Sequence, residues 1–183
     1  MMTRNTRHDV LARQSTASNL EIIESGAAAG LIGGVAMALF ATIWAGAAGL
    51  GFGSPLQSIA ATVLHSSGLV HGATGIVIGL AFHLIVSMLF GIIFAWLVPS
   101  TVAPMPALAF GLAMGVATLI VMTLFIVPVV NPSIRSALIW GSAPGSLPVA
   151  AAFAMHLLYG VGLSFAPGLR RRLRYPSRAR SVA

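Results

Sequence analysis

The sequence predicts an all-α membrane protein with four transmembrane helices in two tandem, parallel halves, each a span, a short interfacial helix and a second span. Of its 183 residues, 57% are hydrophobic and only 7% are charged, whereas soluble domains carry about 25% charged residues. Four apolar stretches each have the roughly 20 residues that a helix needs to cross a bilayer. The two pairs of spans also share a pattern of glycines, turns and one histidine.

The expected spans cover about residues 22–50, 73–98, 105–127 and 147–167. Each is expected to be helical, because the hydrocarbon core has no partner for free backbone N–H and C=O groups. Residues 1–21 form a polar segment that we expect to be disordered. The remainder divides into a single four-helix membrane domain at 22–170, with halves 22–98 and 104–170, and a basic tail at 171–183.

Charge is confined almost entirely to the two ends of the chain. Three arginines precede the first span and six follow the last, while Asp9, Glu21 and Glu24 are the only acids. Cytoplasmic flanks of spans are enriched in arginine and lysine, so we expect a multi-pass membrane protein with both termini in the cytoplasm. The net charge of +7 is interpreted as this topology signal, and nucleic acid is not expected as a partner. The chain has no cysteine, which excludes disulfides and thiolate metal sites.

The two halves correspond along their length. Residues 30–44 (GLIGGVAMALFATIW) align without gaps with 111–125 (GLAMGVATLIVMTLF), and AFHLIVSMLFG aligns with AMHLLYGVGLS on the histidine. Both connections open with a capping residue, Ser54 or Asn131, followed by proline, which is a typical helix start. Apolar residues on one face of 54–68 predict a helix lying on the outer membrane surface. Two spans per half make the repeat parallel.

Small residues recur every four positions in the expected spans. Lipid provides no hydrophobic force between helices, and small residues let their backbones approach closely. We therefore predict helix packing at eight glycines: Gly30, Gly34, Gly75, Gly79, Gly91, Gly111, Gly115 and Gly160. Such faces also serve self-association, so a homo-oligomer or a larger membrane complex is expected in addition to contact with the lipid bilayer.

The second and fourth spans each carry a histidine near the middle, His83 and His156, with Ser87 and Tyr159 close by in sequence. Ionisable residues at this depth are functional candidates. Three interpretations stay open: hydrogen bonding between helices, paired axial ligation of a b-type haem, and a proton or small-solute path. Ion transport normally uses carboxylates, and no Asp or Glu follows Glu24.

Motifs for catalysis or metal binding are absent from the sequence. There is no nucleophile elbow, Walker motif, HExxH or carboxylate pair. His65 and His71, in the first connection, match no strong metal-ligand spacing. The sequence therefore indicates a protein that is not an enzyme. No residue is predicted to bind a metal, except His83 and His156 if they ligate a haem iron.

Three stretches, FHLIVSMLFGIIFAWL, PALAFGLAMGVATLIVMTLFIVP and MHLLYG, precede the arginine-rich end. In them the chain resembles the YagU-like small inner-membrane proteins and related bacterial four-span proteins of unassigned function. The resemblance implies a bacterial cytoplasmic-membrane protein with a link to acid tolerance, and no catalytic residue. The predicted function is a non-enzymatic accessory or stress-related subunit. The alternatives are a bis-histidine haem b subunit of a redox complex and a small proton or solute transporter.

Overall fold

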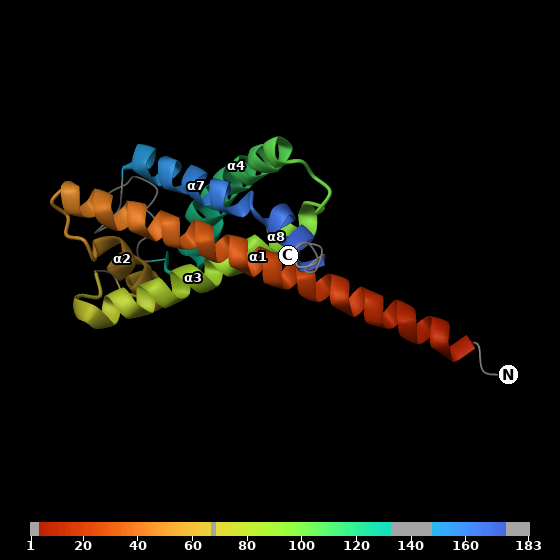
Figure 1. Cartoon of the computed structure of the whole chain (residues 1–183). Coiled ribbons are helices and arrows are strands. Elements are labelled where there is room, and N and C mark those ends of the chain that lie inside the picture. Colours follow the sequence, from red (N-terminus) through yellow and green to blue (C-terminus); the bar gives the residue numbers. More distant parts are fainter. Residues whose placement is uncertain (1–3, 67–68, 133–147, 175–183) are drawn as a thin grey trace, which may run out of the picture.

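The computed structural model describes residues 4–66, 69–132 and 148–174, with side chains described from residue 19 onward. All regular elements in these ranges are helices (Figure 1). They are α1 (Arg4–Ala47), α2 (Ser54–Val63), α3 (Gly72–Leu97), α4 (Pro104–Val121), a π-helix (Met122–Ile126), α5 (Val127–Val130), α7 (Val149–Leu163) and α8 (Ala166–Arg174).

Four of the helical segments are long and apolar enough to cross a membrane: Asn19–Ala47, Gly72–Leu97, Pro104–Val130 and Val149–Arg174. They confirm the all-α class and the four predicted spans. Many large apolar side chains on these helices are exposed, among them Ile43, Val77 and Trp96. In water such a surface would aggregate, whereas lipid solvates it. The chain is therefore a multi-pass membrane protein.

The N-terminal segment differs from the disorder expected for residues 1–21. Helix α1 begins at Arg4, about five turns before the first span. Between Arg4 and Ser25 there is neither glycine nor proline. Once the span is helical, each further residue adds a hydrogen bond without a new nucleation step, so the helix extends into the polar segment.

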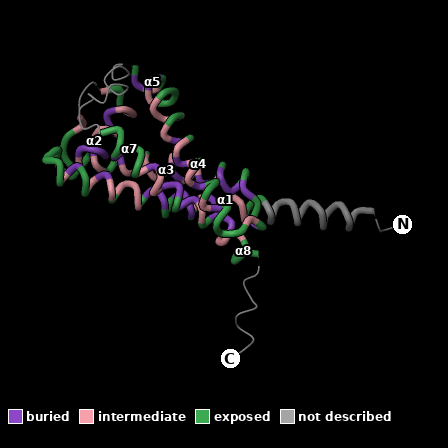
Figure 2. The backbone as a smooth tube through the Cα atoms, turned by 90° about the horizontal axis from the view of Figure 1, so that it is seen from above, coloured by how far each residue is buried: buried purple, intermediate pink, exposed green. Residues whose placement is uncertain are grey.

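The bundle is built around α1, which packs against α3 on one side and α7 on the other (Figure 1). Helix α4 packs against α7, but α3 and α4 scarcely touch each other. Buried residues lie along the inner faces of these helices and exposed residues on the outside (Figure 2). The bundle is therefore closed along α1 and open between α3 and α4.

Most of the predicted packing glycines lie where the backbones of two helices meet. A Cβ added to Gly30 would stand 2.3 Å from the carbonyl oxygen of Ser87, and one added to Gly111 would stand 2.3 Å from that of Gly160. Gly91 and Gly115 are equally close to backbone of α1 and α7, respectively. Both distances are far inside van der Waals contact, so only glycine lets these helices approach so closely.

The tandem repeat stays a prediction. In its favour, Gly30 meets Ser87 as Gly111 meets Gly160, and these pairs are equivalent in the alignment. A two-fold arrangement would also make the α3–α4 contact match the α1–α7 contact, and it does not. Most of the second connection, residues 133–147, lies outside the described residues.

Helix α2 differs from the predicted surface helix. It packs on α3, where a Cβ on Gly79 would stand 1.9 Å from the carbonyl oxygen of Leu56. The N-cap is Gly53, and the Ser54 hydroxyl, already in the first turn, donates to the Gly51 carbonyl. Ser54 as N-cap is therefore wrong. Because Gly79 has no side chain, α2 packs closely against α3. Gly75 and Gly79 therefore contact the connection between the first two spans, and not another span.

Asn131 contacts α2, and the helix that it was predicted to cap lies outside the described residues. Its side chain is 1% exposed. Its amide Nδ2 donates to the carbonyl oxygens of Ala61, at 3.1 Å, and Ser66, at 3.0 Å. Ala61 lies in the last turn of α2 and Ser66 just after the helix, where carbonyl oxygens have fewer intrahelical partners. Asn131 thus ties the end of α5 to α2.

The third span contains the π-helix, which the sequence analysis did not anticipate. Proline at position 128 has no amide hydrogen, and its ring crowds the carbonyl four residues earlier, that of Leu124. A single wide turn is a common way to accommodate such a clash within a continuing helix. The π-helix brings Met122 to the inner side of the bundle, where it lines the cavity described below.

Helix α8 is held to the other elements at its end of the bundle. The Arg171 guanidinium donates to the carbonyl oxygens of Ser100 and Val102 in the α3–α4 loop. Arg174 forms an ion pair with Glu21 of α1. That pair is partly solvated and so contributes little to stability, but it places the N-terminal end of the first span beside the C-terminal end of the last.

Candidate functional site

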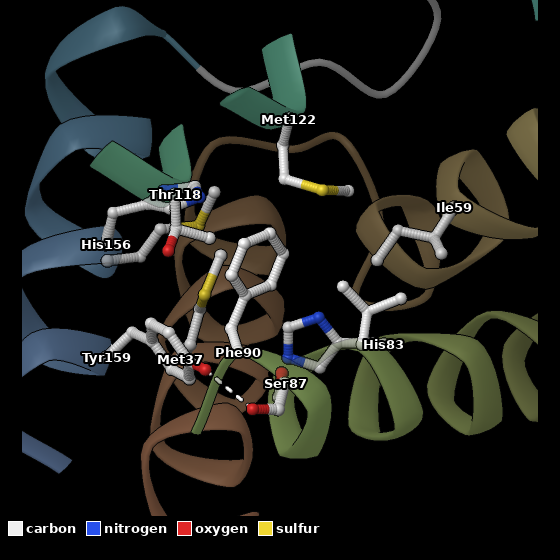
Figure 3. A pocket seen from close by; sticks show the side chains of 11 residues that line it. Met37, Ile59, His83, Ser87, Phe90, Thr118, Met122, His156 and Tyr159 are labelled. Atoms are coloured by element: carbon white, nitrogen blue, oxygen red, sulfur yellow. Dashed lines mark hydrogen bonds between the residues drawn. The ribbon is translucent and has the colours of Figure 1, made fainter. Parts of the chain in front are cut away.

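All four predicted site residues line one cavity of about 200 Å³ inside the bundle. Side chains from every span and from α2 surround it (Figure 3). The lining consists of Met37, Ile59, His83, Val86, Ser87, Phe90, Thr118, Met122, Met155, His156 and Tyr159. The sequence placed His83 and His156 at similar depth in separate helices, and only the fold brings them to the same space.

His83 links α3 to α1. Its ring Nε2 lies 2.9 Å from the carbonyl oxygen of Gly34. A carbonyl oxygen only accepts, so Nε2 carries the proton and donates. The absence of a side chain on Gly34 lets α1 and α3 approach closely enough for this bond, because a Cβ there would collide with Ser87. His83 therefore hydrogen-bonds between helices, as the first of the three interpretations expects.

His156 bonds within its own helix. Its ring Nδ1 lies 2.7 Å from the carbonyl oxygen of Ala152, four residues earlier. Because that carbonyl oxygen only accepts, Nδ1 carries the proton and donates. The side chain is 7% exposed, so the ring is held in one orientation by burial and by this bond.

These two bonds determine what the imidazoles present to the cavity. A charged imidazolium at membrane depth would be costly, and no carboxylate lines the cavity. In the neutral rings, His83 retains a lone pair on Nδ1 and His156 retains one on Nε2. Both unoccupied nitrogens are therefore hydrogen-bond acceptors.

Thr118 supplies an unpartnered hydroxyl. The residue is 6% exposed, and its Oγ1 has no hydrogen-bond partner among the described residues. Native structures rarely leave a buried hydroxyl unsatisfied, and exceptions call for a ligand, a water or a functional role. Thr118 is not among the site residues predicted from the sequence. Its position three residues after Gly115 places it on the packed face of α4, and this spacing could have identified it.

Tyr159 and Ser87 join two helices at the floor of the cavity. The Tyr159 hydroxyl donates to the backbone carbonyl of Ser87 at 2.6 Å. Tyr159 is 2% exposed, and its ring also lies against Gly33 of α1. These contacts connect α7 with α3 and α1, so Tyr159 fixes the shape of the site.

The arrangement does not fit a haem between the two histidines. Axial ligands must face each other across an open slot that holds the macrocycle. Phe90 and Met37 extend into the space between the two imidazoles (Figure 3), and Nε2 of His83 is already bound to Gly34. A cavity of about 200 Å³ is also smaller than the roughly 300–1,000 Å³ of pockets for drug-sized ligands, and a haem is larger than most of these.

The other candidate ligands do not form a metal site in the described part of the chain. No group of three or more His, Cys, Asp or Glu residues there is placed to hold a metal ion. His71 precedes α3 and His65 follows α2, and both are exposed. They lie in the connection, as expected from the sequence.

A second, larger cavity lies between α3 and α4, where these helices fail to pack. We call it the α3–α4 groove. Its volume is about 530 Å³. It is lined by Phe94, Leu97, Val98, Pro99, Val102, Phe110, Ala113, Met114 and Ala117. All are apolar, so the groove suits hydrocarbon.

Comparison with known proteins leaves the site to be interpreted from its own geometry. No protein-family model, curated protein or solved structure matches the chain.

Proposed function

We propose that the protein is a non-enzymatic, membrane-embedded accessory subunit that binds a small bilayer-soluble molecule in the cavity between His83, Thr118 and His156. The observation that carries this proposal is the buried hydroxyl of Thr118, which has no partner among the described residues. The imidazoles of His83 and His156 line the same space. Apolar pockets with a few convergent polar groups are the usual form of a small-molecule site.

Access from the bilayer supports a lipid-soluble ligand. Helices α3 and α4 scarcely touch, and an apolar groove lies between them. The lining has imidazole, hydroxyl and thioether groups but no carboxylate, which suits binding better than proton relay or hydrolysis.

Binding can be tested with para-fluorophenol, which has one ring and one hydroxyl. Methyl NMR of the methionines provides local probes, since Met37, Met122 and Met155 line the cavity and Met105 is exposed at the start of α4. Saturable shifts are expected for the three cavity methyls and not for Met105. An engineered apolar cavity of comparable size takes up benzene, so the volume suffices.

The matched variants for this titration are Thr118→Val and Thr42→Val. The first removes the unpartnered hydroxyl and is expected to weaken para-fluorophenol binding several-fold. The second removes a hydroxyl that bonds only its own helix, to Ala38 and Leu39, and should leave the affinity unchanged. Equal shifts at all methionines, or none at the cavity, would show that the cavity binds nothing of this class.

We also propose that the protein lies in a bacterial inner membrane with both termini in the cytoplasm, and that it is related to the YagU-like proteins. Four spans and arginine-rich ends support this topology. Alkaline phosphatase fused at either terminus should be inactive, and fluorescent protein fused there should fluoresce. An active phosphatase at the C-terminus would place that end in the periplasm and would refute the topology.

A further inference from the structure

The α3–α4 groove is an apolar surface that no described helix covers. On α4, Phe110, Ala113, Met114 and Ala117 recur at spacings of three and four residues, so they form one face of that helix. Helix α3 stands opposite but scarcely touches this face, and Phe110 is 53% exposed although it lines the groove. The groove shares no lining residue with the cavity, so it is a separate site.

One end of the groove lies where the second and third spans end and begin. Leu97 is the last residue of the second span and Pro104 the first of the third. Pro99 and Val102, in the loop between them, line the groove, and so does Ala117, well inside the third span. Lipid headgroups lie at the ends of spans and acyl chains lie between these levels. The groove therefore extends from the headgroup level into the hydrocarbon region.

Helix α8 places a guanidinium at the headgroup end of the groove. The Nη1 of Arg171 donates to the carbonyl oxygens of Val102, at 3.1 Å, and of Ser100, so α8 lies beside the α3–α4 loop (Figure 1). A guanidinium has further N–H groups on Nη2 and Nε. Arg171 is exposed, and these groups have no partner among the described residues. They are available to an anion at the mouth of the groove.

The charged side chains at this end of the described structure are mostly cationic. Helix α8 carries four arginines: Arg170, Arg171, Arg172 and Arg174. The described carboxylates are Glu21, which pairs with Arg174, and Glu24, one turn further along α1. The arginines outnumber the carboxylates, and a cationic cluster beside an apolar groove is complementary to an anionic amphiphile.

We infer that the α3–α4 groove binds an acyl chain of an anionic phospholipid, with the lipid phosphate at the guanidinium of Arg171. Arginine binds phosphate through strong, charge-assisted N–H···O bonds. A zwitterionic phospholipid offers the same phosphate, but its ammonium group would face the other arginines of α8. The site therefore selects for net negative charge in the headgroup, and it does not depend on the ligand proposed for the cavity.

The test adds phosphatidylglycerol, or phosphatidylcholine with the same acyl chains, to the full-length protein in an uncharged detergent. The Met114 methyl resonance reports occupancy of the groove, while that of Met37, in the cavity, should not respond. Phosphatidylglycerol should saturate the Met114 shift at an about tenfold lower concentration, because the arginines attract its net charge. Glycerophosphoglycerol, the same headgroup without chains, should neither shift Met114 nor displace the lipid.

Paired variants separate the headgroup contact from the chain contact. Arg171→Gln should reduce the preference for phosphatidylglycerol to about threefold or less, whereas Arg7→Gln removes the same charge from the part of α1 that precedes the first span and should retain the preference. Ala113→Leu fills the groove and should weaken binding of both lipids several-fold. Ala81→Leu makes the same change at an exposed position of α3 outside the groove and should not.

Three results would overturn the assignment. Equal affinity for the two lipids contradicts it in the wild-type protein, whether or not any variant folds. If phosphatidylglycerol is preferred but neither shifts Met114 nor responds to Ala113→Leu, the arginines bind headgroups at the surface and the groove holds no chain. If the Met114 shift follows protein concentration without added lipid, a second copy of the chain covers the groove. The para-fluorophenol titration reports on the cavity methionines, so its outcome is decided separately.

Discussion

Replacing Gly91 by Ala is expected to destabilise the bundle by about 1–3 kcal/mol, the usual cost of inserting a methyl group into a packed interior. The new Cβ would stand 2.2 Å from the carbonyl oxygen of Gly26, 2.7 Å from Cα of Gly30 and 2.8 Å from its nitrogen. All three atoms are backbone, so no side chain can rotate away. Helices α1 and α3 would have to separate, and the gain in helix propensity from Gly to Ala, about 1 kcal/mol, offsets only part of this.

The matched control is Gly168→Ala in α8. Its nearest non-local atom would be a guanidinium nitrogen of Arg171 at 3.8 Å, an ordinary contact. With the clash absent, the propensity gain remains and the variant should be as stable as the wild type or slightly more so. Unfolding by sodium dodecyl sulfate from mild detergent, followed by circular dichroism, measures both. Equal stability of the two variants would contradict the close α1–α3 approach.

Replacing Tyr159 by Ala is expected to cost about 3–5 kcal/mol, as for other large buried aromatics. Tyr159 is 2% exposed and contacts three of the four spans through its own helix, the Ser87 carbonyl and Gly33. Its removal would enlarge the neighbouring cavity and free α7 from α3. Tyr159→Phe keeps the ring and loses only the hydrogen bond, so we expect about 0.6–1.5 kcal/mol.

Phe153→Ala provides the comparison for Tyr159 on the same helix. Phe153 is 44% exposed and faces outward, and lipid solvates the site after truncation. The same unfolding titration should rank the variants with Tyr159→Ala least stable, then Tyr159→Phe, then Phe153→Ala near the wild type. If Phe153→Ala were the most damaging, the inner face of α7 would be assigned incorrectly.

Local sequence patterns identified some of the cavity residues but not their contacts. His83 and His156 were singled out because an imidazole in an apolar helix is unusual whatever surrounds it. The glycines were singled out because small residues at a four-residue spacing predict close contact. Neither pattern indicates which carbonyl an imidazole meets, so Gly34 and Ala152 as partners, and hence the two acceptor nitrogens, emerged only from the folded chain.

The sequence by itself determined the four spans, the all-α class and the glycine-lined contacts, because hydropathy and residue size act over one or two helical turns. Only the tertiary structure decided that α2 sinks against Gly79, that Asn131 reaches across to α2, and that α3 and α4 stay apart. These outcomes depend on which surfaces meet after the helices form. The same holds for Thr118, whose hydroxyl is ordinary in sequence and becomes a candidate ligand contact only because no described neighbour satisfies it.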